Sequence, residues 1–65
     1  MEIISLKGPH RIVRFPRDDG IGDGYWYRSE TLLQGLSLGS TYGTLAEAEG
    51  DFLYTILHDT SEKGG

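Results

Sequence analysis

The chain has 65 residues, a formal net charge of −4 and no cysteine. A chain of this length forms a single domain that buries only about 60% of its unfolded surface. The lack of cysteine excludes disulfide-stapled scaffolds and thiolate metal sites. No apolar run approaches the roughly 18 residues of a membrane-spanning helix, and the first residues lack the basic start and long apolar core of a signal peptide. We therefore expect a soluble, cytoplasmic protein with no membrane partner.

The charge is unevenly distributed along the chain. Residues 1–28 sum to +1, whereas residues 29–65 sum to −5. Nucleic-acid binders usually carry a clear basic excess, so the acidic balance disfavours that class. An acidic surface suits a basic protein partner, and it also serves plain solubility.

Two short strands are expected near the N-terminus. Residues 1–6 contain a β-branched Ile-Ile pair and end at a Lys-Gly-Pro turn. Residues 10–15, HRIVRF, are rich in strand formers and are closed by Pro16. Residues 17–24 contain three glycines and three aspartates, which predicts a long hairpin loop.

The aromatic segment YWYRS at residues 25–29 gives the strongest strand signal. Alternation places Trp26 and Arg28 on one face of the strand and the two tyrosines on the other. Because Trp26 is the largest apolar side chain of the chain, we expect its face to meet the helix.

The next segment, residues 30–39, fits either a strand or a single helical turn. Gly35 and Gly39 each penalise a helix, so we favour a strand over residues 33–38.

Residues 41–58 predict one long amphipathic helix. Thr44 and Glu47 form the T-x-x-E pattern of a capping box at its start. At 100° per residue one sector of the helix is apolar; its members are Leu45, Ala48, Phe52, Leu53 and Ile56. The opposite side is polar and comprises Glu47, Asp51, Tyr54, Thr55 and His58.

Glu49 falls inside the apolar sector of this helix. A carboxylate there requires a partner, because an unpaired buried charge is costly. We therefore predict an ion pair between Glu49 and an arginine of the sheet, either Arg14 or Arg28.

Together the elements predict an α+β fold, in which a small antiparallel sheet of three or four strands packs against one C-terminal helix. Residues 1–59 are expected to form this single domain. Residues 60–65 have no apolar anchor and are expected to be a mobile polar tail.

No catalytic or metal-binding motif is evident. The loop aspartates lack the spacing of a calcium-binding loop and are typical of turns. Glu47, Asp51 and His58 suit the helix dipole better than a metal or acid–base site. We therefore expect a protein that is not an enzyme and that needs no cofactor or metal.

The best candidates for partner contacts are aromatic, arginine and acidic side chains. Tyrosine and arginine are enriched at interface hot spots, although ordinary cross-strand pairing explains them equally well. A second candidate surface is the acidic side of the helix. The predicted partner-binding residues are Arg14, Arg17, Tyr25, Tyr27, Arg28, Glu47 and Asp51.

Three segments within residues 11–58 follow a known pattern: YWYR at 25–28, LG at 38–39 and YGTLAEAE at 42–49. They resemble the three-strand-plus-helix DNA-binding module of plant ethylene-response factors and the arm-binding domain of phage tyrosine integrases. The resemblance implies a helix behind the sheet and DNA contacts on the exposed sheet face. The positions that match such contacts are Arg11, Arg14, Arg17, Tyr25, Tyr27 and Arg28. This chain departs from the pattern in its acidic hairpin loop and acidic net charge.

Three functions are considered, and the last of them is a small accessory subunit of an enzyme. The first is a small protein-binding module, such as a phage or mobile-element inhibitor of the anti-CRISPR kind, which blocks a basic nucleic-acid channel of its partner. The alternative is a DNA-binding module of the integrase-arm type that uses its sheet.

Overall fold

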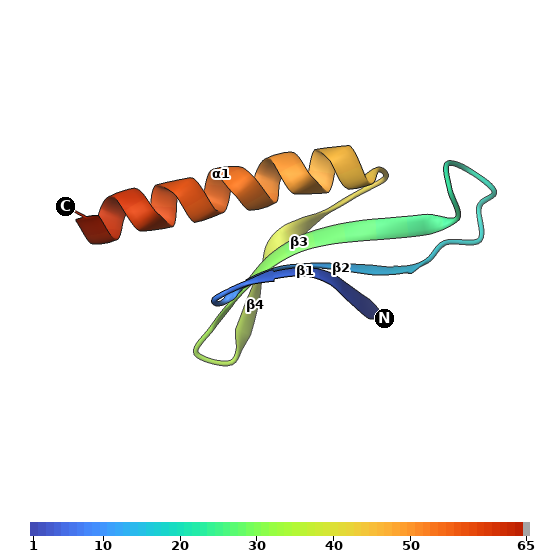
Figure 1. Cartoon of the computed structure of the whole chain (residues 1–65). Helices are drawn as coiled ribbons and strands as arrows, with labels where there is room; N and C mark the ends of the chain where they lie inside the picture. Colours follow the sequence, from blue (N-terminus) through green and yellow to red (C-terminus); the bar gives the residue numbers. More distant parts are fainter. Residues whose placement is uncertain (65) are drawn as a thin grey trace.

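The computed structural model describes the backbone of residues 1–64 and the side chains of residues 1–58. It confirms the α+β fold, with a four-stranded antiparallel sheet and one C-terminal helix (Figure 1). The elements are β1 (Glu2–Lys7), β2 (His10–Pro16), β3 (Tyr25–Leu33), β4 (Leu36–Tyr42) and α1 (Leu45–Gly64).

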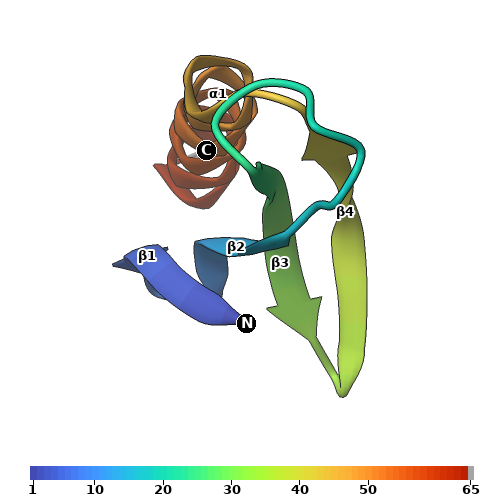
Figure 2. The ribbon, with the colours of Figure 1, turned by 90° about the vertical axis from the view of Figure 1, so that its right-hand side faces the viewer.

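The strands form a meander, in which each strand pairs with the next along the chain. The sheet order is β1-β2-β3-β4, so β1 and β4 are its edges. The helix lies against one face of the curved sheet, as Figure 2 shows in a view close to the helix axis. Among the described residues, no other element covers the opposite face.

A two-residue turn joins β3 and β4. Gln34 and Gly35 have φ values of 51° and 81°, the left-handed pair that a tight hairpin of type I′ requires. The strand predicted over residues 33–38 is therefore wrong in its bounds, because the chain reverses inside it. The sequence did not predict this turn, because Asn or Asp is the usual residue at the position that Gln34 occupies.

The core lies between α1 and the middle of the sheet. Ile12 from β2, Tyr27 from β3, and Ala48 and Phe52 from α1 form one buried cluster. Partly buried apolar side chains surround it, among them Leu45 and Ile56. With so few buried side chains, the domain depends heavily on each of them.

The apolar stripe by which the helix contacts the sheet is narrower than the sequence predicts. Ala48 and Phe52 are buried, but Leu53 is 63% exposed and Leu57 is similarly exposed. Asp51 and Thr55 take the place beside the core stripe, and both are only partly exposed. The prediction that Leu53 shares the core sector and that Asp51 and Thr55 face away is therefore wrong.

The faces of β3 are also reversed relative to the prediction. Tyr27 is 3% exposed in the core under α1, and Tyr25 packs against the same cluster. Trp26 therefore points to the face that no helix covers. The large size of Trp26 did not determine which face of β3 is buried. The neighbouring strand β2 carries apolar side chains on both of its faces, so either face of the sheet could have packed against the helix.

The start of α1 uses the predicted capping pair. The Glu47 amide donates to Thr44 Oγ1 at 3.3 Å, and the Thr44 hydroxyl donates to Glu47 Oε1 at 3.0 Å. The helix continues to Gly64, beyond the predicted end at residue 58. The prediction that residues 60–65 form a mobile tail stays a prediction, because their side chains and the last residue lie outside the described part of the chain.

Candidate partner-binding surface

In the described part of the chain, no helix or strand covers the face of the sheet turned away from α1, and we call this face the open face. The strand registers align its residues across the sheet; Val13, for example, lies between Ile3 of β1 and Arg28 of β3. The open face comprises Ile3, Leu6, Arg11, Val13, Phe15, Trp26, Arg28, Glu30, Leu32, Ser37, Gly39 and Thr41.

Apolar side chains make up much of the open face. Val13 is only 1% exposed although no helix covers it, so its strand neighbours screen it from water. Ile3, Leu6 and Leu32 are all more than 40% exposed. An uncovered sheet face with apolar groups is typical of a surface that another molecule covers.

A buried carboxylate lies at the centre of this face. Glu30 is 6% exposed, and its Oε2 accepts from Arg11 Nε. Its Oε1 accepts from Arg28 Nε at 3.0 Å and from Ser37 Oγ at 2.8 Å. Three strands thus contribute to one network of hydrogen bonds that links β2, β3 and β4.

The network holds Glu30 in its charged form. Burial acts to raise the pKa of Glu30, but hydrogen bonds from Ser37, Arg11 and Arg28 outweigh it, and the pKa lies below its ordinary value. A carboxyl whose pKa is lower in the folded state adds stability above its unfolded pKa. That stability is lost as the pH falls through the folded pKa.

We therefore expect Glu30→Gln to lower the free energy of unfolding at pH 7 by about 2 kcal/mol, because it leaves two half-buried guanidinium groups without their carboxylate. The difference from the parent should shrink as the pH falls below about 4. Urea unfolding at several pH values measures both effects. Glu49→Gln is the matched control and should stay within about 0.5 kcal/mol of the parent. Equal losses for both variants would contradict this role of Glu30.

The ion pair predicted for Glu49 is absent among the described residues. Glu49 is exposed on α1, and Arg14 and Arg28 pair with Glu2 and Glu30 instead. The sheet does hold a carboxylate–arginine network, but its carboxylate comes from β3. Trp26, Arg28 and Glu30 are two residues apart along β3, and this spacing in the sequence could have predicted that their side chains share one face of the sheet.

Arg17 is locked inside the loop that joins β2 and β3. Its guanidinium lies 3.7 Å from the centre of the Trp26 ring and binds both oxygens of Asp19 at 2.6–2.7 Å. The side chain is only 6% exposed. The contact with Arg17, together with the Ile21 amide, holds the pKa of Asp19 below its ordinary value. Arg17 therefore stabilises the conformation of the loop through Asp19 and Trp26.

The remaining sheet residues of the predicted site are also engaged within the fold. Arg14 Nε donates to Glu2 at 2.7 Å, and its guanidinium lies 4.3 Å from the Tyr25 ring centre. Tyr27 donates its hydroxyl to Asp23, which lowers the pKa of Asp23 and raises that of Tyr27. Arg14, Tyr25 and Tyr27 thus lie on the helix side, while Arg28 lies on the open face, so they do not form one patch.

The acidic helix residues of the predicted site have separate positions. Glu47 is exposed and caps the helix, as described above. Asp51 accepts from the Tyr42 hydroxyl at 2.5 Å and from the Thr55 hydroxyl at 3.1 Å, so it ties α1 to the end of β4. The Asp51 carboxylate therefore stabilises the packing of α1 against β4 in addition to adding a negative charge to the surface.

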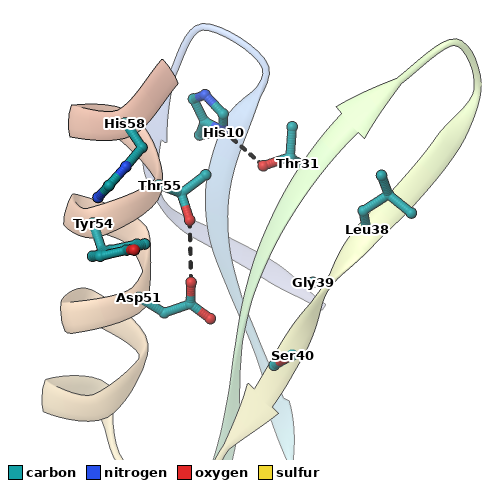
Figure 3. Close-up of a pocket in the computed structure, with 9 residues that line it drawn as sticks. All are labelled: His10, Thr31, Leu38, Gly39, Ser40, Asp51, Tyr54, Thr55 and His58. Carbon is teal, nitrogen blue, oxygen red and sulfur yellow. Dashed lines mark hydrogen bonds between the residues drawn. The ribbon is translucent and has the colours of Figure 1, made fainter. Parts of the chain in front are cut away.

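A groove of about 550 Å³ separates the second half of α1 from β4 (Figure 3). Several of its side chains contact one another: His10 Nδ1 lies 2.7 Å from Thr31 Oγ1, and the centres of the Tyr54 and His58 rings lie 4.0 Å apart. In the described residues, no three histidine or acidic side chains gather in a way that would hold a metal ion. The groove is lined by His10, Thr31, Leu38, Gly39, Ser40, Asp51, Tyr54, Thr55 and His58.

Comparison with protein families, with curated proteins and with solved structures finds no match for this chain. In the described part of the chain, the helix α1 is not long and apolar enough to cross a membrane.

Proposed function

We propose that this chain is a small, non-enzymatic protein-binding module whose open face docks onto a protein partner. The observation that supports this most is the uncovered sheet face, with exposed Ile3, Leu6 and Leu32 around a preformed Arg11–Glu30–Arg28 network. Rigid apolar groups beside organised charges are the composition of a protein interface.

The pairing of the arginines supports a protein partner over DNA. The chain has four arginines, and each lies within 4.0 Å of a carboxylate oxygen: Arg11 and Arg28 with Glu30, Arg14 with Glu2, and Arg17 with Asp19. DNA affinity arises mainly from cations that are available to phosphates. Here every arginine already forms an ion pair within the fold, and the two on the open face share the one carboxylate of Glu30.

The proposed partner has a basic surface. Acidic side chains collect in loop 17–24 and in the first turn of α1, which lie at the same end of the molecule (Figure 1). With a net charge of −4, the module would be steered towards a basic channel and would compete there with nucleic acid. An inhibitor of the anti-CRISPR kind acts in this way, and we propose that role as the specific form of this function.

Affinity capture from a host lysate, followed by quantitative mass spectrometry, tests the docking face. The open-face variant is Leu6→Glu/Leu32→Glu, and the matched control is Leu53→Glu/Leu57→Glu on the exposed flank of α1. We expect a basic protein captured by the parent and by the control to be lost from the open-face variant. Circular dichroism must show that both variants are folded. Retention by the open-face variant together with loss from the control would overturn the assignment of the face.

The DNA-binding alternative requires affinity that falls steeply with salt. Gel shifts with random duplex at low salt measure it directly. We expect no shift at micromolar protein, because no arginine is left unpaired. A shift that Arg28→Ala removes would instead support the integrase-arm function.

A further inference from the structure

The two edges of the sheet are protected to very different degrees. An edge strand exposes a row of unpaired N–H and C=O groups, which natural proteins shield with charges, proline or bulges. β1 carries Glu2 and Lys7, and its register is interrupted by an irregularity between Ile3 and Ser5. These features discourage a further strand from pairing with β1.

β4 has none of these features. Its sequence, LSLGSTY, contains no charged residue and no proline, and its register with β3 is unbroken. Six of its seven residues, Leu36–Thr41, are exposed. β4 is therefore an open strand edge that is ready to pair with another strand.

The tight turn determines which backbone groups of β4 point outward. In a two-residue hairpin the residues that flank the turn, Leu33 and Leu36, exchange both of their hydrogen bonds. Alternation then directs the N–H and C=O of Leu38 and Ser40 towards β3 as well. The outward groups belong to Ser37, Gly39 and Thr41.

We propose that β4 pairs antiparallel with β4 of a second copy of this chain, about a two-fold axis at Gly39. This register places Gly39 opposite Gly39 and Ser37 opposite Thr41 of the other copy. Every outward group is then used, in about six hydrogen bonds. Moving the axis to Leu38 or Ser40 loses one of the pairs.

The side chains on β4 fit the same register. Leu38 faces Ser40 of the second copy and Leu36 faces Tyr42, all on the helix side of the joined sheet. Leu36 and Leu38 are both more than half exposed in the single chain, and this pairing covers them with apolar or small neighbours. No charge lies opposite a like charge, because β4 has none. A two-fold interface must be complementary to itself, and β4 meets that requirement.

The proposed dimer is independent of the proposed function, because it uses the edge of the sheet and not its open face. Joining two sheets at β4 would place the two open faces side by side on one surface. Each copy carries a net charge of −4, so long-range repulsion opposes assembly and added salt should strengthen it.

Sedimentation-velocity ultracentrifugation between about 10 and about 500 μM tests the assembly. We expect the parent to shift from monomer to dimer within this range, at lower concentration in high salt. Leu38→Lys/Ser40→Lys places two lysine pairs directly opposite each other and should weaken the dimer about tenfold or more. Leu38→Lys/Ser40→Glu is the matched control, since each lysine then faces a glutamate of the other copy, and it should restore the dimer.

A second experiment mixes two variants of opposite charge. The variants Leu38→Lys/Ser40→Lys and Leu38→Glu/Ser40→Glu should each be monomeric alone and should form a dimer together, because opposite charges then meet across the edge. Circular dichroism confirms that all variants remain folded; if the lysine pair variant does not fold, Ser37→Lys/Thr41→Lys serves as the replacement, because these two positions also lie opposite each other in this register. A parent that stays monomeric up to about 500 μM in high salt would overturn the proposal. A dimer that persists unchanged in the lysine pair variant would also overturn it.

Discussion

Phe52→Ala is expected to lower the free energy of unfolding by about 3–5 kcal/mol and to unfold much of the protein. Phe52 is 9% exposed and contributes the largest apolar side chain of α1 to the buried cluster with Ile12, Tyr27 and Ala48. Removing its ring leaves a cavity where the helix meets the sheet. So small a core has no other aromatic group from α1 to fill that space. Thermal melts followed by circular dichroism measure the loss.

Leu53→Ala is the matched control for this prediction. Leu53 follows Phe52 directly, yet its side chain is largely exposed. We expect its truncation to change stability by no more than about 0.5 kcal/mol. Comparable losses for the two variants would mean that α1 is rotated about its axis relative to the described packing.

Gly39→Ala is expected to cost about 3 kcal/mol, the second large effect. A Cβ at Gly39 would lie 2.0 Å from the Ser29 carbonyl oxygen and 2.7 Å from Glu30 Cα, and both of these atoms are backbone. Backbone atoms of a paired strand cannot move aside as a flexible side chain can. β4 would have to separate from β3 at this point, next to the Glu30 network.

Gly50→Ala provides the opposite result for comparison. A Cβ at Gly50 meets nothing within 4 Å, and the residue lies inside α1. Alanine there should stabilise the protein by about 0.5–1 kcal/mol, because glycine weakens a helix interior. Chemical denaturation of the two variants should therefore move the midpoint in opposite directions. A stable Gly39→Ala protein would show that β3 and β4 lie further apart than described.

Local signals in the sequence predicted the elements of this fold well. The capping pair Thr44–Glu47 correctly marked the start of α1 at Leu45, although the helical segment predicted over residues 41–58 began four residues too early, where β4 ends. The Lys-Gly-Pro turn and the glycine-rich loop correctly separated β1, β2 and β3. These features depend on backbone conformation within a few residues, which sequence patterns report directly.

The choice of faces could not be predicted in the same way. In β2, Ile12 and Val13 are neighbours that point to opposite faces, and both are almost fully buried. A single helix covers only one face of the sheet. The two faces carry similar numbers of apolar side chains, so the sequence did not determine which face the helix covers. The structure places Tyr27 under the helix and Trp26 outside it. Residues predicted to meet a partner, such as Tyr27 and Arg17, therefore became internal contacts, while Leu6, Glu30 and Leu32 emerged on the open face.

The outward position of Trp26 gives the protein a built-in optical reporter. It is the only tryptophan of the chain, and the Arg17 guanidinium covers its ring from one side. Its fluorescence therefore reports on the loop and on the open face. A partner that docks on the open face should change the wavelength or intensity of tryptophan emission while the far-ultraviolet circular dichroism stays constant. Titration of the unlabelled protein can thus follow occupancy of that face directly.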